Sequence, residues 1–185
     1  MVSAKPFVFV HINKTGGSSI EQALARPLAH KTAREYIAEM GWLAWQQHYT
    51  FSVVRNPWDK VVSHYHWRIH TNQTALAERP LAFSEWVKRA YGEQDPVYYD
   101  KPKMFMPAID WLVDESGQLV VKKIARFEHL AQDFQSICET LGIQRKLPHL
   151  KKTPREHYHH CYDDESQQII ADWFKRDIEL FDYHF

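Results

Sequence analysis

The sequence predicts an α/β fold of three layers, in which helices flank a central parallel sheet on both faces. Short apolar runs rich in Val and Phe alternate with helical segments, an order typical of parallel strands joined by crossover helices. The runs at Pro6–His11 and Thr50–Val54 are each followed by a polar turn and then by a helical pattern. We expect about four or five strands, with ligands bound at the carboxyl edge of the sheet.

The composition fits a single domain that spans residues 1–185. Hydrophobic residues make up 44% of the chain, and seven Trp, nine Tyr and ten Phe supply a core without a disulfide scaffold. The 23 basic and 23 acidic side chains cancel, which argues against a general nucleic-acid binder. No apolar run approaches the ~20 residues of a membrane helix. We therefore expect a cytoplasmic protein with no membrane span.

In the first part of the chain, strands and helices alternate. Two of the expected helices have the spacing of a capping box near their start, Ser18 with Glu21 and Thr32 with Glu35. In chain order we expect a strand at Pro6–His11, a helix at Gly17–Ala25, a helix at Thr32–Met40, a strand at Thr50–Val54 and a helix that begins at Pro57.

The second part of the chain has weaker signals. The tetrapeptide DESG is a turn signal between two short apolar runs, and Gly142 is a natural helix C-cap. We expect a helix at Phe83–Tyr91, a loop at Lys101–Pro107, a hairpin or two short strands at Trp111–Val113 and Leu119–Ala125, a helix at Glu128–Leu141, a basic loop at Leu147–Pro154 and a last helix at Glu165–Leu180.

The loop HINKTGGSS after the first strand has the chemistry of a site for a phosphate-like anion. Gly16 and Gly17 allow a tight turn, and the following helix presents free N–H groups. A Walker motif is absent because the lysine precedes the glycines, which weakens the case for a nucleotide hydrolase. A plain turn, with one serine as helix cap, is the alternative. The polar side chains that would hold the anion are Lys14, Thr15, Ser18 and Ser19.

A second strand, turn and helix follow in FSVVRNPWDKVVS. Arg55 lies at the carboxyl end of the strand, where ligands of open α/β sheets bind. Ser63 lies two turns into the helix, and an arginine and a serine that converge on one phosphate would be chemically sensible. Alternatively, Arg55 pairs with Asp59 and Ser63 is an ordinary helix residue.

Together, HINKTGGSS and RNPWDKVVS resemble the paired signatures of sulfotransferases that use 3'-phosphoadenosine 5'-phosphosulfate (PAPS). The sequence is most similar to the carbohydrate branch, which includes heparan sulfate and chondroitin enzymes and soluble bacterial relatives. The resemblance extends to RFEHL and to the C-terminal segment that starts at YDDES. It implies a P-loop-like fold and sulfuryl transfer from PAPS to an acceptor hydroxyl on a carbohydrate. It also implies that Lys14 to Ser19 hold the 5'-phosphosulfate, while Arg55 and Ser63 hold the 3'-phosphate.

Sulfuryl transfer needs a cation for the leaving phosphate oxygen and a base for the acceptor proton. Lys14 is the candidate for the cation. Among twelve histidines, His30 is the candidate for the base because it precedes the helix capped by Thr32, whose N-terminus favours a neutral imidazole. Related sulfotransferases often carry a histidine in this segment. His48 is the second candidate, with aromatic packing as the alternative.

Two late segments and one aromatic group are open to more than one interpretation. The resemblance implies that the basic loop reaches the nucleotide through Lys152 and Thr153. Alternatively, the pattern LKKTPRE indicates a solvated loop followed by the start of a helix. HYHHC is too tightly spaced for a structural zinc site, and we expect no metal. The aromatic residues of the middle could line an acceptor cleft or pack in a core: Trp86, Tyr91, Tyr98, Tyr99 and Phe105.

Two other functions remain open at this point. One is an ATP-using transferase or kinase with an atypical phosphate loop, although the spacing typical of magnesium ligands is lacking. The other is a nucleotide-binding protein without catalysis.

Overall fold

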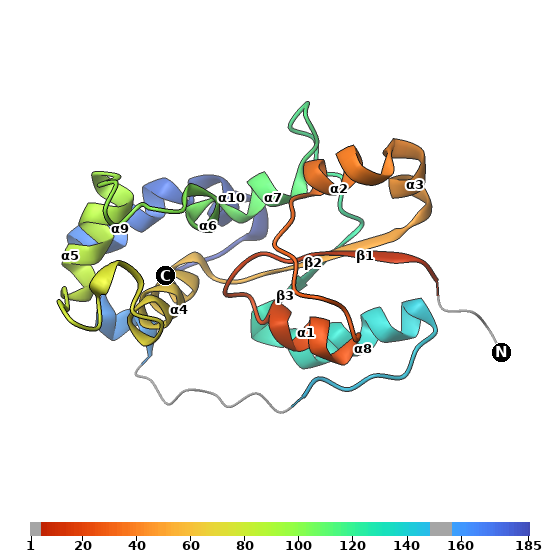
Figure 1. Ribbon diagram of the computed structural model, residues 1–185, viewed down its shortest axis with the longest axis horizontal. Helices are drawn as coiled ribbons and strands as arrows, with labels where there is room; N and C mark the ends of the chain where they lie inside the picture. The colour runs from red at the N-terminus through yellow and green to blue at the C-terminus, as the bar shows by residue number, and fades with distance from the viewer. Residues whose placement is uncertain (1–4, 149–156) are drawn as a thin grey trace. The chain divides into compact units, whose positions relative to one another are not determined.

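A computed structural model describes residues 5–148 and 157–185 of the chain (Figure 1). The chain forms two compact units. The first takes the described residues of Met1–Arg55 and Ala108–Lys152, and the second those of Asn56–Pro107 and Thr153–Phe185. Each unit has a hydrophobic core of its own. A single domain over residues 1–185 therefore stays a prediction.

The first unit contains a parallel sheet in the order β1-β2-β3. The strands are β1 (Phe7–Val10), β2 (Tyr49–Val54) and β3 (Lys123–Arg126). Phe7 pairs with Tyr49, so β1 and β2 begin at the same edge. Both strands that the apolar runs predicted are confirmed, because their Val and Phe side chains are almost all buried. Within the described residues the sheet has three strands, fewer than the four or five expected.

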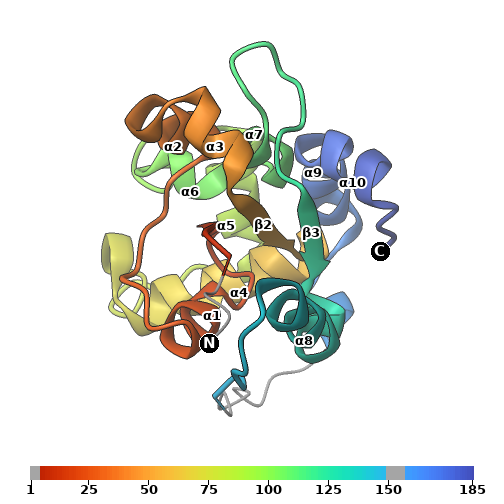
Figure 2. The same cartoon turned by 90° about the vertical axis from the view of Figure 1, so that its right-hand side faces the viewer.

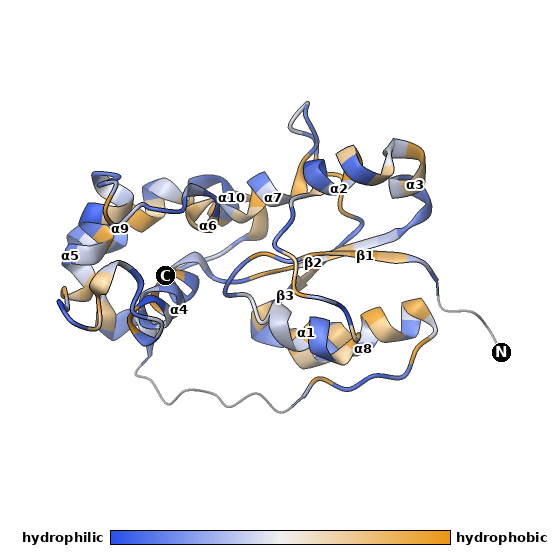
Figure 3. Ribbon diagram, in the orientation of Figure 1, coloured by the Kyte–Doolittle hydropathy of each residue, from blue (hydrophilic) through white to orange (hydrophobic). Residues whose placement is uncertain are grey.

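Helices cover both faces of this sheet. Figures 1 and 2 show α1 (Gly17–Ala23) and α8 (Leu130–Leu141) on one face, and α2 (Ala33–Met40) and α3 (Trp42–Gln47) on the other. Figure 3 shows β1 as a hydrophobic strand between helices that carry both colours, as expected when one face of each helix is buried. The predicted three-layer α/β arrangement is confirmed.

The helix caps of the first unit differ in how well they match the sequence pattern. The capping box of Thr32 and Glu35 is present, and Gly142 ends α8 in the left-handed conformation. The predicted capping box of Ser18 and Glu21 is wrong. Gly16 is the N-cap of α1 and no side chain caps this helix.

The segment before β3 also differs from the prediction. Trp111 lies in a short helix, α7 (Ala108–Leu112), so the strand expected at Trp111–Val113 is wrong. The run expected at Leu119–Ala125 forms a strand only at its end, where β3 begins, and Val113 makes a single antiparallel bridge with Leu119. The turn between them forms as DESG predicted, since the Asp114 carboxylate accepts the backbone N–H groups of Ser116 and Gln118.

The second unit is helical in its described residues. Asn56 caps α4 (Pro57–His70), where Pro57 occupies the first turn as predicted. Two expectations are wrong. The segment expected as a loop contains α6 (Pro102–Phe105), and the expected last helix is divided into two. The other helices are α5 (Phe83–Val87), which continues as a π-helical turn over Lys88–Gly92, α9 (Asp164–Trp173), α10 (Lys175–Phe181) and 3-10 turns at Gln73–Ala75 and Tyr158–Cys161.

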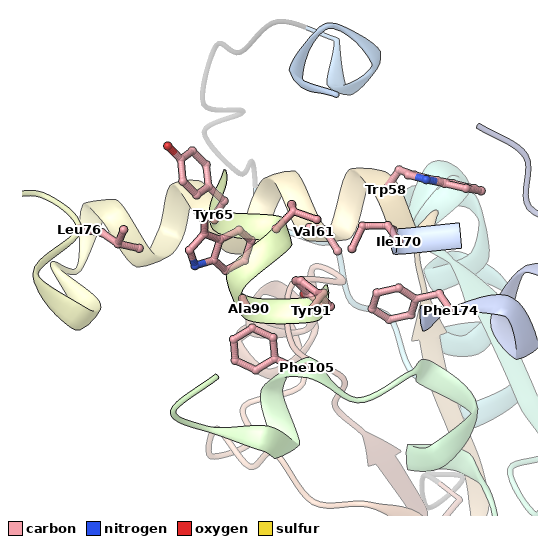
Figure 4. Close-up of a cluster of buried hydrophobic side chains, with 11 residues drawn as sticks. Trp58, Val61, Tyr65, Leu76, Ala90, Tyr91, Phe105, Ile170 and Phe174 are labelled. Carbon is pink, nitrogen blue, oxygen red and sulfur yellow. The ribbon is translucent and has the colours of Figure 1, made fainter. Parts of the chain in front are cut away.

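Large aromatic side chains form the core of the second unit (Figure 4). Trp86, Tyr91 and Phe105 are at most 3% exposed and contact one another, so they are core residues and do not line an acceptor cleft. Tyr98 and Tyr99 pack against this core. In the part of the chain that the structure describes, no helix is both long enough and apolar enough to cross a membrane.

Candidate active site

The loop between β1 and α1 turns tightly at the carboxyl end of β1. Lys14 (φ 64) and Gly16 (φ 82) both adopt the left-handed region, which costs free energy at the non-glycine position. The Thr15 hydroxyl donates to the carbonyl of Ile12 at 2.8 Å, and the Ser19 N–H donates to the carbonyl of Gly16 at 3.1 Å. These bonds hold the loop in its turn.

The two glycines of the loop are required by close packing. A Cβ atom on Gly17 would overlap the imidazole ring of His11. A Cβ atom on Gly16 would lie 2.8 Å from Cδ2 of Leu130 and 3.2 Å from the ring of Phe127. The loop can therefore take this conformation only without side chains at these positions.

The hydroxyl groups of the loop differ in exposure. Thr15 and Ser19 are 0% and 2% exposed, and the Thr15 hydroxyl already has a backbone acceptor. Ser18 is exposed in the first turn of α1, and Lys14 is half-buried. Ser18 and Lys14 are thus the loop side chains that a ligand can reach from solvent.

Arg55 joins the second sequence motif to the first. It follows β2 directly, and its Nη1 donates to the Lys14 carbonyl at 2.8 Å. The guanidinium lies over the ring of Phe127, with Cζ 4.0 Å from the ring centroid. Arg55 is only 6% exposed. This hydrogen bond and this stacking contact hold its planar group beside the loop.

Phe127 is a site residue whose role the sequence did not reveal. It follows β3 immediately, in the segment RFEHL. The guanidinium of Arg55 lies over its ring, and the same ring closes the space in which a Gly16 side chain would lie. An aromatic residue directly after a strand of the sheet was the signal that could have identified it, because parallel strands end at the same edge.

His30 lies at this same edge of the sheet. Its Nδ1 is 3.1 Å from the carbonyl oxygen of His11, the residue that follows β1, and the two imidazole rings lie 4.2 Å apart. A carbonyl oxygen can only accept, so Nδ1 of His30 carries the proton and Nε2 keeps a lone pair. Trp111 contacts the ring edge-on at 6.4 Å. This geometry assigns the tautomer in which Nε2 can accept a proton.

His11 is a neutral neighbour of His30. Burial, and to a smaller extent the nearby His30, lowers the pKa of His11 to about 3. The side chain is 2% exposed and lies against Gly17. At neutral pH it therefore places no positive charge beside His30.

His48 lies at the opposite edge of the sheet. It is the C-cap of α3 and precedes Tyr49, which opens β2. Its Nδ1 is 2.6 Å from the carbonyl oxygen of Ala44. Because β1 and β2 are parallel and in register from their first residues, His48 is at the amino edge, away from the loop.

The remaining predicted residues are not brought to this site within the first unit. Ser63 is half-buried on α4, which belongs to the second unit. Lys152 and Thr153 lie outside the described residues. The rings of His157 and His159 pack against each other at 4.4 Å, and no group of metal-ligating side chains occurs over residues 5–148 and 157–185.

Comparison with known proteins bears on the family and the fold of the chain. The sequence model of the sulfotransferase family matches residues 1–184. Among solved structures, a sulfotransferase from Alicyclobacillus acidocaldarius superposes with a TM-score of 0.52 and 16% identity, covering 98% of each chain. At this identity the likeness shows the fold alone, and it matches the predicted one. No curated protein matches the chain.

Proposed function

Because the chain belongs to the sulfotransferase family, we propose that it transfers a sulfuryl group from PAPS to a hydroxyl group of a carbohydrate. Family membership confirms the resemblance that the two motifs carried and supports a transferase. The donor, the acceptor and the carbohydrate branch are the proposal. One observation carries it above all: Arg55 donates to the carbonyl of Lys14, so the cations of both motifs lie at one edge of the sheet.

The residues at this edge fit a donor with two separate phosphate groups. We assign the 5'-phosphosulfate to the loop from Lys14 to Ser19, and the 3'-phosphate to Arg55. Ser63, on α4 of the second unit, stays a candidate for the 3'-phosphate on the sequence motif alone. The guanidinium of Arg55 is planar and carries several N–H donors, a geometry that matches a phosphate group. Lys152 and Thr153 remain candidates for further contacts with the nucleotide.

The proposed chemistry is an in-line displacement at sulfur. The acceptor oxygen attacks the sulfur atom, and the bond from sulfur to the 5'-phosphate oxygen breaks with its electron pair on that oxygen. Lys14 stabilises the charge that develops there. His30 takes the proton of the acceptor hydroxyl at Nε2. The leaving product is adenosine 3',5'-bisphosphate.

A hollow on the first unit supports a carbohydrate acceptor. It has a volume of about 370 Å³, and its lining includes Arg34 and Ile37 of α2, Trp42 at the start of α3, and the turn at residues 114–116. The Trp42 side chain is 43% exposed. A sugar presents an apolar face to an indole ring and hydroxyl groups to neighbouring polar side chains. The hollow lies along α2, whose N-cap Thr32 follows His30 closely in the chain.

Calorimetry with three nucleotides tests the donor assignment. Adenosine 3',5'-bisphosphate should bind about ten- to a hundredfold more tightly than AMP, because a charge-assisted hydrogen bond to the 3'-phosphate contributes ~1.5–3 kcal/mol. ATP should bind weakly, since it lacks the 3'-phosphate. Equal affinity for adenosine 3',5'-bisphosphate and AMP would refute the assignment, and preferential binding of ATP would favour a kinase-like transferase.

A further inference from the structure

Glu21 has no part in the proposed chemistry, yet it is buried beside the site. It lies on α1 one turn after Gly17 and is 5% exposed. Burial raises the pKa of its carboxyl group, although the backbone N–H of Ala29 acts in the opposite direction. Burying a carboxylate is unfavourable unless its oxygens are paired. Its contacts should therefore explain why a carboxylate occupies this position.

The Glu21 carboxylate contacts both supports of His30. Oε1 accepts the backbone N–H of Ala29, the residue before His30, at 3.0 Å. The same oxygen lies 3.0 Å from Nδ1 of His11. The carbonyl of His11 is in turn the acceptor for Nδ1 of His30. Oε1 thus bonds α1 to the chain that carries His30. It also touches His11, although its contact with Nδ1 lacks hydrogen-bond geometry, and Oε2 has no hydrogen-bond partner among the described residues.

The packing of His11 makes this arrangement specific. Gly17 and Glu21 are four residues apart and so lie on the same face of α1. The His11 ring occupies the space where a Gly17 side chain would be, with Nδ1 directed to Glu21 and its ring 4.2 Å from His30. A shift of His11 would therefore move the carbonyl on which His30 depends.

We propose that Glu21 is a positioning residue for His30. It holds Ala29 and His11 in place, which keeps the proton of His30 on Nδ1 and the lone pair on Nε2. This inference rests on the proposed role of His30 as the base. The carboxylate acts by accepting the backbone N–H of Ala29, so glutamine can replace it and an apolar residue of similar size cannot.

The decisive measurement is the tautomer of His30, observed by long-range ¹H–¹⁵N NMR of the full chain. Wild type and Glu21→Gln should both show the proton on Nδ1. Glu21→Leu should show a mixture of tautomers, and kcat should fall about 10–100-fold, as for other residues that orient a histidine. KM for PAPS should stay unchanged in Glu21→Leu, because the loop and Arg55 are untouched.

Glu39→Leu is the matched control. The Glu39 carboxylate also pairs with a neighbour of His30 in the chain, because it accepts from Nζ of Lys31 at 2.6 Å. Unlike Glu21, this pair is exposed. Its removal should leave the tautomer and kcat unchanged.

Three results would overturn the inference: a proton on Nε2 of His30 in wild type, an unchanged tautomer and kcat in Glu21→Leu, or a Glu21→Gln variant as impaired as Glu21→Leu. If Glu21→Leu fails to fold, the wild-type spectrum can still overturn the inference, and the tautomer and kcat of Glu21→Gln still test it. The NMR result also does not depend on the donor, so failure of the proposed function would appear separately, as a His30→Ala variant with full turnover.

Discussion

Replacement of Arg55 by alanine tests how the two motifs act together. Arg55 is 6% exposed, donates to the Lys14 carbonyl at 2.8 Å and stacks on Phe127 at 4.0 Å. The substitution removes the proposed contacts with the 3'-phosphate. It also frees one carbonyl of the loop and uncovers one ring face, so a smaller loss is expected for any nucleotide that uses the loop.

The magnitude follows from the hydrogen bonds at stake. Charge-assisted bonds to a phosphate contribute ~1.5–3 kcal/mol each, which corresponds to a loss of about ten- to a hundredfold in affinity for adenosine 3',5'-bisphosphate. The bond from Arg55 to the Lys14 carbonyl holds the loop and does not contact the ligand, so AMP should lose about tenfold or less. The affinity of Arg55→Lys for adenosine 3',5'-bisphosphate should lie between those of wild type and Arg55→Ala. An ammonium group keeps the charge but cannot stack on a ring and donate to two acceptors in one plane as a guanidinium does.

Calorimetry with both nucleotides measures the two losses separately. Arg26→Ala is the matched control, since Arg26 also lies over a ring, that of Phe7 at 4.8 Å, but at the opposite end of β1. It should bind both nucleotides as wild type does. If Arg55→Ala loses the same factor for AMP as for adenosine 3',5'-bisphosphate, Arg55 supports the loop and does not bind the 3'-phosphate.

Three further substitutions separate the proposed roles. Lys14→Ala should reduce turnover more than affinity for PAPS, because the cation acts on charge that develops in the transition state, and normal turnover at saturating PAPS would exclude this role. His30→Ala should lose ~10²–10⁴-fold in turnover while it binds nucleotide normally, and His48→Ala should change turnover little. The reverse ranking would move the base to His48. Trp42→Ala should raise KM for a saccharide acceptor about tenfold without changing nucleotide affinity. Leu43→Ala, at the exposed neighbouring residue, should leave this KM unchanged. Equal effects of the two substitutions would show that the acceptor does not bind in the hollow.

Elements with a local signal can be predicted from the sequence. The strands Phe7–Val10 and Tyr49–Val54 are short apolar runs that end in polar turns. Thr32 with Glu35, Pro57 and Gly142 each mark a helix end through residues only a few positions apart. Such patterns depend on hydrogen bonds and backbone conformations that neighbouring residues determine, so they can be recognised without knowledge of the tertiary structure.

Features that depend on distant packing cannot be predicted in this way. Ser18 and Glu21 have the spacing of a capping box, but the helix starts earlier because Gly16 takes the left-handed conformation and Gly17 packs on His11. Glu21 therefore turns inward to Ala29. The break at Phe174, between α9 and α10, likewise has no glycine or proline that would predict it. There the fully buried Phe174 side chain belongs to the core of the second unit.

The choice between histidines shows the same limit within the site. His30 and His48 both lie between the two motifs, and the sequence alone places neither at a particular edge of the sheet. The register of β1 with β2 places His48 at the amino edge, while the bond from His30 to the His11 carbonyl places His30 at the carboxyl edge. The fold was predictable from local patterns, and the assembly of the site was not.

The most direct test of the proposed function is a transfer assay with PAPS and a panel of oligosaccharides, read by mass spectrometry of both products. We expect a sulfated saccharide and adenosine 3',5'-bisphosphate to appear in equal amounts with wild type, and His30→Ala to form both at ~10²–10⁴-fold lower rates. Release of adenosine 3',5'-bisphosphate without a sulfated saccharide would contradict the acceptor assignment. Absence of both products, in a protein shown to bind adenosine 3',5'-bisphosphate, would contradict the account of the site as a carbohydrate sulfotransferase.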